Sequence, residues 1–245
     1  MALAHSPKII TDGLVLALDA GNTKSYPGSG TTWTDLSGNG NTGTLVNGVG
    51  YSGSNLGSLS FDATDDYIRI NDSNILDLTT ALTLSIWFNR GDILTLASGD
   101  QHNLFLKGYS NAPGGDQYNY GMTLFGPTGG GMYMWMHPTT LTGNLTPPSQ
   151  IFFANQWYNI VITHVSGSTP IPYLNGVQLT NWTATNPTTP LVANTYRATI
   201  SGDAERARAA TFNGRIAQVS IYNKSLTAAE IQQNYEALRG RFGLT

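Results

Sequence analysis

Short runs of apolar residues recur from one end of the chain to the other. Each run has four to nine residues, is rich in β-branched or aromatic side chains, and is bounded by Gly, Asn, Asp or Pro, which is the pattern of β-strands. The pattern predicts strands at residues 14–18, 58–61, 67–70, 82–88, 103–107, 121–125, 132–136, 157–165, 196–200 and 214–222. An Asn-Gly pair at 175–176 adds a hairpin signal, because it suits the two positive-φ positions of a type I′ turn. About ten strands without interleaved helices predict an antiparallel sandwich.

One helix is predicted, over residues 227–238. Thr227 and Glu230 form the capping-box pattern Thr-x-x-Glu, and apolar residues at helical spacing follow it. Gly240 is placed to end the helix in the left-handed conformation. We expect this helix to dock on the sandwich. The sequence contains no linker, heptad or internal repeat, so residues 1–245 are predicted to be one domain.

Four segments have the composition of long loops, since they are rich in Gly, Pro, Asn and Thr. They span residues 108–120, 137–149, 183–195 and 201–210. On a β-sandwich, loops gather at the ends and edges, which is where recognition is usually placed. These segments are therefore where we first look for binding residues.

Several stretches in order along the chain carry a family resemblance. They are GLVLALD at 13–19, WTDLSGNGNTG at 33–43, LSFDATDDYI at 59–68, LTLSIWF at 82–88, WYNIVIT at 157–163, YLNG at 173–176, FNGRI at 212–216 and IYNKSLTAAEIQQNY at 221–235. Together they resemble the laminin G-like branch of the concanavalin A-like lectin/glucanase superfamily. The resemblance implies an all-β fold, a two-sheet antiparallel jelly-roll sandwich with one short C-terminal helix. Its first and last strands would lie close together, in a single laminin G-like jelly-roll domain over residues 1–245.

Composition and charge narrow the function classes. Only 11% of the residues are charged and the net charge is −3, so the chain has no basic stripe for binding nucleic acid. No apolar run approaches the ~20 residues that span a bilayer, so membrane insertion is not expected. The chain has no cysteine, which excludes disulfides and a thiol nucleophile. The N-terminus lacks the basic and apolar segments of a signal peptide, so ordinary secretion is not expected.

The enzymes of that superfamily are distinguished by a pair of catalytic carboxylates. Retaining glucanases need two carboxylates about 5–5.5 Å apart, which the family supplies from a Glu-x-Asp-x-x-Glu strand. The three glutamates of this chain are Glu205 in a predicted loop and Glu230 and Glu236 in the predicted helix. The four histidines are scattered without metal or triad spacing. The sequence therefore predicts a protein that is not an enzyme.

Clustered acidic residues offer oxygen ligands for calcium. The candidates are Asp19, Asp35, Asp62 and Asp65, each in a segment that reads as a turn. Related jelly rolls often hold a structural calcium near the first and last strands or on a loop rim. None of the spacings is that of an EF-hand loop, and Asp is also an ordinary turn residue. Both interpretations stay open, and no cofactor is required by either.

Aromatic residues in the predicted loops suggest a glycan site. Tyr109, Tyr118, Asn119, Tyr120 and Trp182 are the candidates, because sugars stack on exposed aromatic faces while nearby amides bind the hydroxyl groups. Packing of these side chains within their own loops explains the composition equally well.

The segment 19–39, which contains DAGNTKSYP and DLSGN, resembles versions of the domain carried by tailed phages of aquatic bacteria. A virion protein is made in the host cytoplasm and released by lysis, so it needs no signal peptide. We therefore expect a non-enzymatic protein of the virion surface, as a capsid decoration, knob or tail appendage that adheres weakly to glycans. Its partners would be other virion proteins or copies of itself. The alternatives are a cell-surface carbohydrate-binding adhesin and, third, a glycoside hydrolase.

Overall fold

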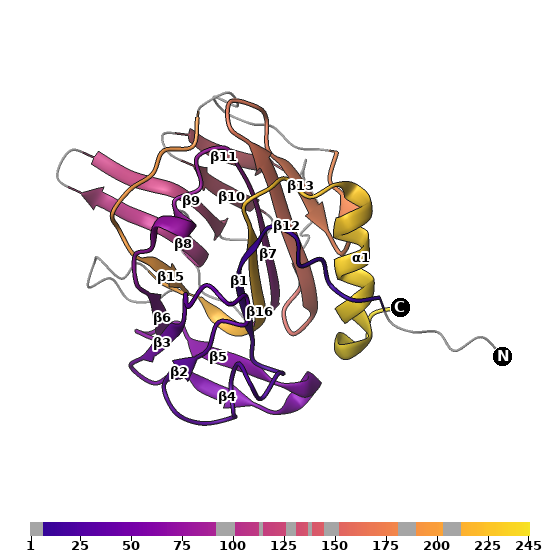
Figure 1. Ribbon diagram of the computed structural model, residues 1–245. Helices are drawn as coiled ribbons and strands as arrows, with labels where there is room; N and C mark the ends of the chain where they lie inside the picture. The colour runs from indigo at the N-terminus through magenta and orange to yellow at the C-terminus, as the bar shows by residue number, and fades with distance from the viewer. Residues whose placement is uncertain are drawn as a thin grey trace.

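Two antiparallel β-sheets pack face to face in the computed structural model of the chain (Figure 1). The structure describes residues 7–91, 101–112, 115–125, 131–136, 139–144, 152–180, 190–202 and 212–245. Every strand pair within these ranges is antiparallel. The predicted class, an all-β jelly-roll sandwich with one short C-terminal helix, is confirmed.

The first sheet is built around two long central strands. Its order is β14 (Val177–Gln178), β13 (Ile171–Leu174), β12 (Trp157–Val165), β7 (Ala81–Arg90), β16 (Asn213–Tyr222), β5 (Ser58–Asp62) and β4 (Gly50–Ser52). The remaining strand, β1 (Leu14–Asp19), pairs with the C-terminal half of β16, while β5 pairs with its N-terminal half. The first and last strands therefore lie side by side, as the family resemblance implies.

The second sheet covers one face of the first. Its order is β11 (Thr139–Asn144), β10 (Gly131–Met136), β9 (Gly115–Phe125), β8 (Gln101–Ala112), β15 (Ala198–Ile200), β6 (Tyr67–Ile70), β3 (Gly43–Val46) and β2 (Thr32–Trp33). The predicted loop at 108–120 is wrong, because residues 108–112 belong to β8 and residues 115–120 to β9, and the two strands pair. The predicted loop at 137–149 likewise contains β11. The other two predicted loops lie largely outside the described residues.

The main hydrophobic core lies between the sheets. Alternate side chains of β7, among them Ile86 and Phe88, point into it and are fully buried. Phe105 of β8 and Tyr120 of β9 belong to the same core from the opposite sheet. The intervening Trp87 belongs instead to a second apolar cluster. The two-residue period of a strand thus divides β7 between the core and the outer face of its sheet.

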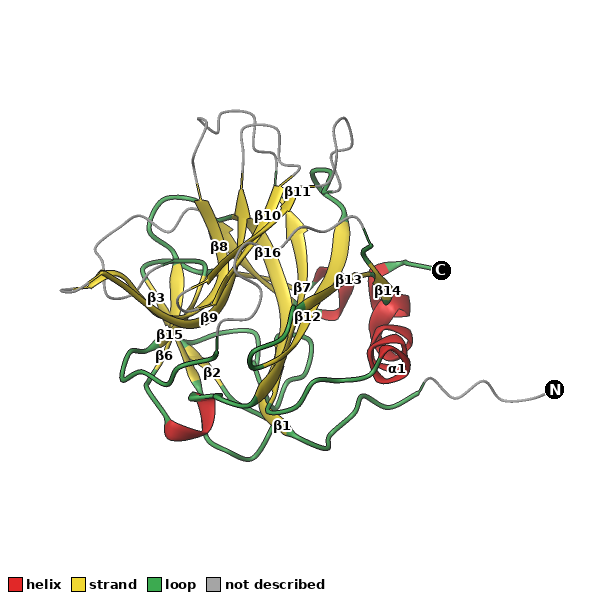
Figure 2. Cartoon of the chain, turned by 90° about the horizontal axis from the view of Figure 1, so that it is seen from above, coloured by secondary structure: helices red, strands yellow, loops and turns green. Residues whose placement is uncertain are grey.

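Helix α1 (Ala228–Leu238) and the following 3-10 turn η3 (Arg239–Phe242) cover that outer face (Figure 2). The predicted capping box is present, with Thr227 and Glu230 bonding each other's backbone N–H. The Trp87 ring stacks on Tyr235 and Phe242, with centroids 5.7 and 4.3 Å apart. The left-handed residue is Gly243 rather than the predicted Gly240, because η3 continues the chain for another turn.

Two further 3-10 turns lie in the first third of the chain, η1 (Ser54–Leu56) and η2 (Asn74–Leu76). Together with β2, β3 and β4 they were not predicted, because they are too short to show a period in the sequence. Within the described ranges, no helix has both the length and the hydropathy needed to cross a bilayer.

Candidate functional site

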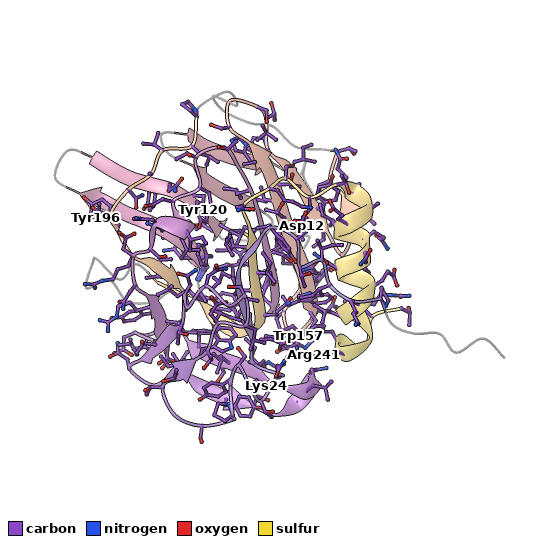
Figure 3. All side chains as sticks on the ribbon, in the orientation of Figure 1. Asp12, Lys24, Tyr120, Trp157, Tyr196 and Arg241 are labelled. Carbon is purple, nitrogen blue, oxygen red and sulfur yellow. The ribbon has the colours of Figure 1, made fainter. Side chains whose placement is uncertain are left out.

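Three of the predicted glycan residues are buried, among them Tyr120, which Figure 3 labels. Tyr120 is fully buried, stacks on Phe105 at 5.9 Å, and donates its hydroxyl to the carbonyl oxygen of Leu76 at 3.0 Å. Burial raises the pKa of the Tyr120 hydroxyl. Tyr118 and Asn119, on the same strand, are also buried. Buried side chains present neither a ring face nor an amide to a sugar, which corrects the glycan prediction for Tyr118, Asn119 and Tyr120.

Two predicted glycan residues cannot be assessed in the same way. The side chain of Tyr109, a residue of β8, lies outside what the structure describes, and so does Trp182. The prediction for these two residues stays a prediction.

The carboxylate of Asp35 accepts four hydrogen bonds from β1 and from its own turn. Its Oδ1 accepts hydrogen bonds from the backbone N–H groups of Ala17 and Ser37, both at 2.9 Å. Its Oδ2 accepts from the hydroxyl of Ser37 at 2.7 Å and the backbone N–H of Asn41 at 3.0 Å. This is the turn-forming role that competes with calcium binding in the sequence. The structure therefore corrects the calcium prediction for Asp35.

Arg241 joins the C-terminal turn to two distant segments (Figure 3). Its guanidinium donates to the carboxylate of Asp19 at 2.6 Å and to the carbonyl oxygens of Asn55 and Gly57 at 2.7 and 2.5 Å. The Asn55 amide donates back to the Arg241 carbonyl at 3.3 Å and accepts from the Trp157 indole at 3.2 Å. We call this set the Arg241 clamp. It engages Asp19 in an ion pair through Oδ1, and the calcium prediction for Asp19 stays a prediction.

Asp62 and Asp65, the remaining candidates, are brought together with Asp66. One carboxylate oxygen from each lies within 4.8 Å of the other two, a spacing that suits ligands of one Ca²⁺ at 2.3–2.6 Å. Burial raises the pKa of Asp66, and the neighbouring charge of Asp62 raises it further. Asp66 follows Asp65 in the same acidic segment of the sequence, and the structure brings its carboxylate into the same group. The triad is the one place where the described part of the chain gathers three acidic groups.

The two glutamates within the described ranges are committed to the C-terminal helix. Glu230 closes the capping box with Thr227 and accepts from the ammonium group of Lys224 at 2.9 Å. The hydrogen bond from the Thr227 backbone lowers the pKa of Glu230 below its ordinary value. Glu236 pairs with Arg239 at 2.5 Å. Neither glutamate sits on a strand, so neither supplies the strand-borne carboxylate pair of a retaining glucanase.

The described histidines do not form a catalytic pair. His102 lies on β8 and His164 on β12, in different sheets. Both are buried. Burial lowers the pKa of His164 to about 4, so this imidazole is neutral at physiological pH.

A buried lysine ties two loops to the second sheet. Lys107 of β8 is fully buried, and its ammonium group lies 2.7 Å from Asp72 and 3.0 Å from Asp77. It also donates to the carbonyl oxygens of Asn194 and Tyr196 at 3.2 and 2.6 Å; Tyr196 is labelled in Figure 3. Two carboxylates and two carbonyls surround one cation, so the group is charge-compensated and its role is structural.

A family model described as the concanavalin A-like lectin/glucanases superfamily matches residues 62–232. The chain belongs to this superfamily. The match covers most of both sheets and the start of α1, and it confirms the resemblance to the concanavalin A-like superfamily. The sequence matches no curated protein.

Solved structures of the same fold include binding domains and enzymes. The binding domain of Paraclostridial Mosquitocidal Protein 1 has 17% identity and a TM-score of 0.69, with 92% of this chain and 52% of that one covered. The binding domain of botulinum neurotoxin serotype G has 14% identity and a TM-score of 0.64, with 91% and 50% covered. Trypanosoma rangeli sialidase in complex with sialic acid has 16% identity and a TM-score of 0.65, with 97% and 36% covered. This superfamily member thus spans about a third to a half of these chains, and at such identities the likeness shows the fold alone.

Proposed function

We propose that this protein is a non-enzymatic surface protein of a virus particle, a capsid decoration, knob or tail appendage, that adheres to glycans. The observation that carries the binding role is the match of residues 62–232 to a superfamily of lectins and glucanases, in a chain whose two described glutamates are committed to helix contacts. Two of the similar structures are binding domains, of Paraclostridial Mosquitocidal Protein 1 and of botulinum neurotoxin serotype G, and a binding role for this chain agrees with them.

Weak single-site binding is sufficient for such a role. Many copies on one particle convert a millimolar affinity into useful avidity, without a deep pocket in any one copy. The partners would be other virion proteins or copies of this chain, together with the glycans of the surface that the particle meets. Placement on a virus particle is supported by the sequence of residues 19–39, which resembles versions of the domain carried by tailed phages.

The glycan role is tested with the purified full chain on an array of immobilised saccharides. Binding to a defined subset, at higher signal when the protein is clustered on a multivalent carrier, is the expected result. A chain that binds no saccharide even when clustered would overturn the proposal. Release of reducing sugar from a laminarin-type glucan would show instead that the protein is a glycosidase.

Location is tested by quantitative mass spectrometry of density-banded virus particles from the source culture. We expect many copies per particle. Absence from particles together with recovery in the cell-envelope fraction would favour the alternative, a cell-surface carbohydrate-binding adhesin.

We also propose that Asp62, Asp65 and Asp66 hold a structural calcium ion. The ion would neutralise three clustered carboxylates and fix the turn between β5 and β6. Millimolar Ca²⁺ should raise the melting temperature of the wild type, because a ligand that binds only the folded state stabilises it. An equal rise in a variant with Asp65→Asn and Asp66→Asn would show that calcium binds elsewhere.

A further inference from the structure

An exposed tyrosine is held rigid on the edge strand of the first sheet. The Tyr51 side chain of β4 is 40% exposed. The centroid of its ring lies 5.3 Å from that of the buried Tyr26. Two glycines also pack closely against it: a Cβ added to Gly28 would lie 3.4 Å from the Tyr51 ring, and a Cβ added to Gly57 would lie 2.9 Å from the Tyr51 hydroxyl. Contacts at the ring and at the hydroxyl fix this aromatic surface before any ligand arrives, which lowers the entropy cost of binding.

A leucine stands at the tip of the adjacent loop, in a conformation that suits glycine. Leu56 has a φ of 63° and is 71% exposed. It follows Asn55, also left-handed at 55°, and precedes Gly57 at 122°. A left-handed conformation at a residue other than Gly costs roughly 1–3 kcal/mol. The Arg241 clamp holds the loop in this shape, because the guanidinium binds the carbonyl oxygens on both sides of Leu56.

Folding alone does not account for Leu56. The position disfavours leucine twice, through its backbone conformation and through the exposure of an apolar side chain, and glycine or asparagine would suit both conditions better. The side chain has 71% of its surface free, so it contributes little to the core. A contact made outward, one residue before the Gly57 that lies against the Tyr51 hydroxyl, would explain why an apolar side chain is displayed here.

One exposed cation lies on the loop that packs against Tyr51 and favours an anionic ligand. Lys24 is the only charged residue in the segment 20–34, and the segment 36–61 contains none. Lys24 is exposed on the loop that carries Tyr26 and Gly28, and it lies at the same end of the molecule as β4 (Figures 1 and 3). The carboxylates that flank these segments are engaged, Asp19 with Arg241 and Asp35 within its own turn, so Lys24 is the cation that a ligand would meet on this loop.

We propose that Tyr51, Leu56 and Lys24 form a binding site for an acidic saccharide. A sugar ring stacks on the face of Tyr51 and contacts Leu56, and a carboxylate or sulfate of the saccharide pairs with Lys24. This assignment rests on the glycan role proposed above and names the surface and the ligand class. It moves the glycan site from the predicted loops to the β4 edge.

The test compares binding of the full chain to alginate oligosaccharides, heparin oligosaccharides and neutral cello-oligosaccharides of matched length, by isothermal titration calorimetry. The wild type should prefer an acidic probe. Tyr51→Ala should weaken that binding about tenfold or more, while Tyr51→Phe retains it. Lys24→Gln should remove the preference for acidic over neutral saccharides.

Leu56→Gly separates binding from folding. Glycine suits a φ of 63°, so this variant should melt at the same temperature as the wild type or higher, yet bind more weakly. Val177→Ala is the matched control, because Val177 is 67% exposed at the opposite edge of the same sheet and its loss should leave binding unchanged.

The outcomes distinguish this site from the function itself. Acidic-saccharide binding that survives Tyr51→Ala and Leu56→Gly overturns the site and leaves the glycan role intact. A wild type that prefers the neutral probe overturns the assignment to acidic saccharides. A wild type that binds neither these probes nor any saccharide on the array overturns the glycan role as well.

Discussion

His164 is buried in a way that makes folding sensitive to acid. Its side chain is 2% exposed, and neither ring nitrogen has a hydrogen-bond partner in the structure. Burial lowers its pKa to about 4, whereas the unfolded chain keeps the ordinary value near 6.5. The folded state therefore binds this proton less readily than the unfolded state, and stability falls as the pH drops below about 6.5. Between pH 7 and pH 4 the loss from this one residue is about 3 kcal/mol.

His164→Leu removes the titrating group and keeps an apolar side chain of moderate size. We expect the variant to gain about 3 kcal/mol relative to the wild type when the pH is lowered from 7 to 4. Urea unfolding followed by tryptophan fluorescence gives the free energy of each protein at both pH values. Subtracting the free energy of unfolding of one protein from that of the other at each pH cancels the contribution of the carboxylates that they share. A difference that is the same at pH 7 and pH 4 would refute the argument, because His164 would then be solvated or partnered in solution.

Three further perturbations test the electrostatics and the cap. Lys107→Met should cost about 3–5 kcal/mol in urea unfolding, because it leaves two partly buried carboxylates without their cation; a loss below about 1 kcal/mol would mean that water replaces the ammonium group. Thr227→Ala should lower stability by about 0.5–2 kcal/mol, and an unchanged melting curve would contradict the capping role. Asp65→Asn, in metal-free buffer, should raise stability at pH 7 by a few tenths of a kcal/mol and leave it unchanged at pH 2. The sign follows because like charge raises the pKa of Asp66, so the folded state is penalised once these carboxylates ionise; stabilisation that persists at pH 2 would contradict it.

Local patterns predicted the elements whose signals are local. The capping box at Thr227 and Glu230 gave the start of α1, because both partners lie within one helical turn. The Asn-Gly pair gave the hairpin between β13 and β14, and Asn175 and Gly176 have the positive φ values that its turn requires. These features depend on residues a few positions apart, so the sequence shows them directly.

The candidate site could not be predicted in the same way. The Tyr- and Asn-rich composition of residues 108–120 is typical of a loop, yet it belongs to two long strands. The hydroxyl of Tyr120 bonds to Leu76, 44 positions away, and no local pattern shows that pairing. Asp19 appeared free to bind a cation because its partner Arg241 is 222 positions distant.

Tyr51 and Leu56 were not predicted as binding residues, because nothing in the sequence shows that they are exposed. Each looks like an ordinary apolar residue in the sequence, and only the fold shows that Tyr51 is on an edge strand and that Leu56 is left-handed and exposed. The loop around Leu56 is held by the Arg241 clamp, which joins segments from three parts of the chain. The strands and the helix could therefore be predicted from the sequence, whereas the exposed residues of the candidate site could be identified only in the folded structure.

The Arg241 clamp also sets how the protein would respond to a pulling force. Strand β1 pairs with β16 so that Leu14 lies opposite Tyr222, and tension applied to these two ends alone would peel the ladder open one hydrogen bond at a time. The chain beyond β16 instead returns along the sheet through α1, and Arg241 fastens it to Asp19 at the other end of β1. A load applied at the two ends of the chain therefore meets this ion pair and the Trp87 stack on the C-terminal side, and the hydrogen bonds of Lys8 and Ile10 to α1 on the N-terminal side, before it reaches the ladder. A protein that held a particle to a surface in flowing water would carry its load first on the contacts of α1 and the C-terminal turn.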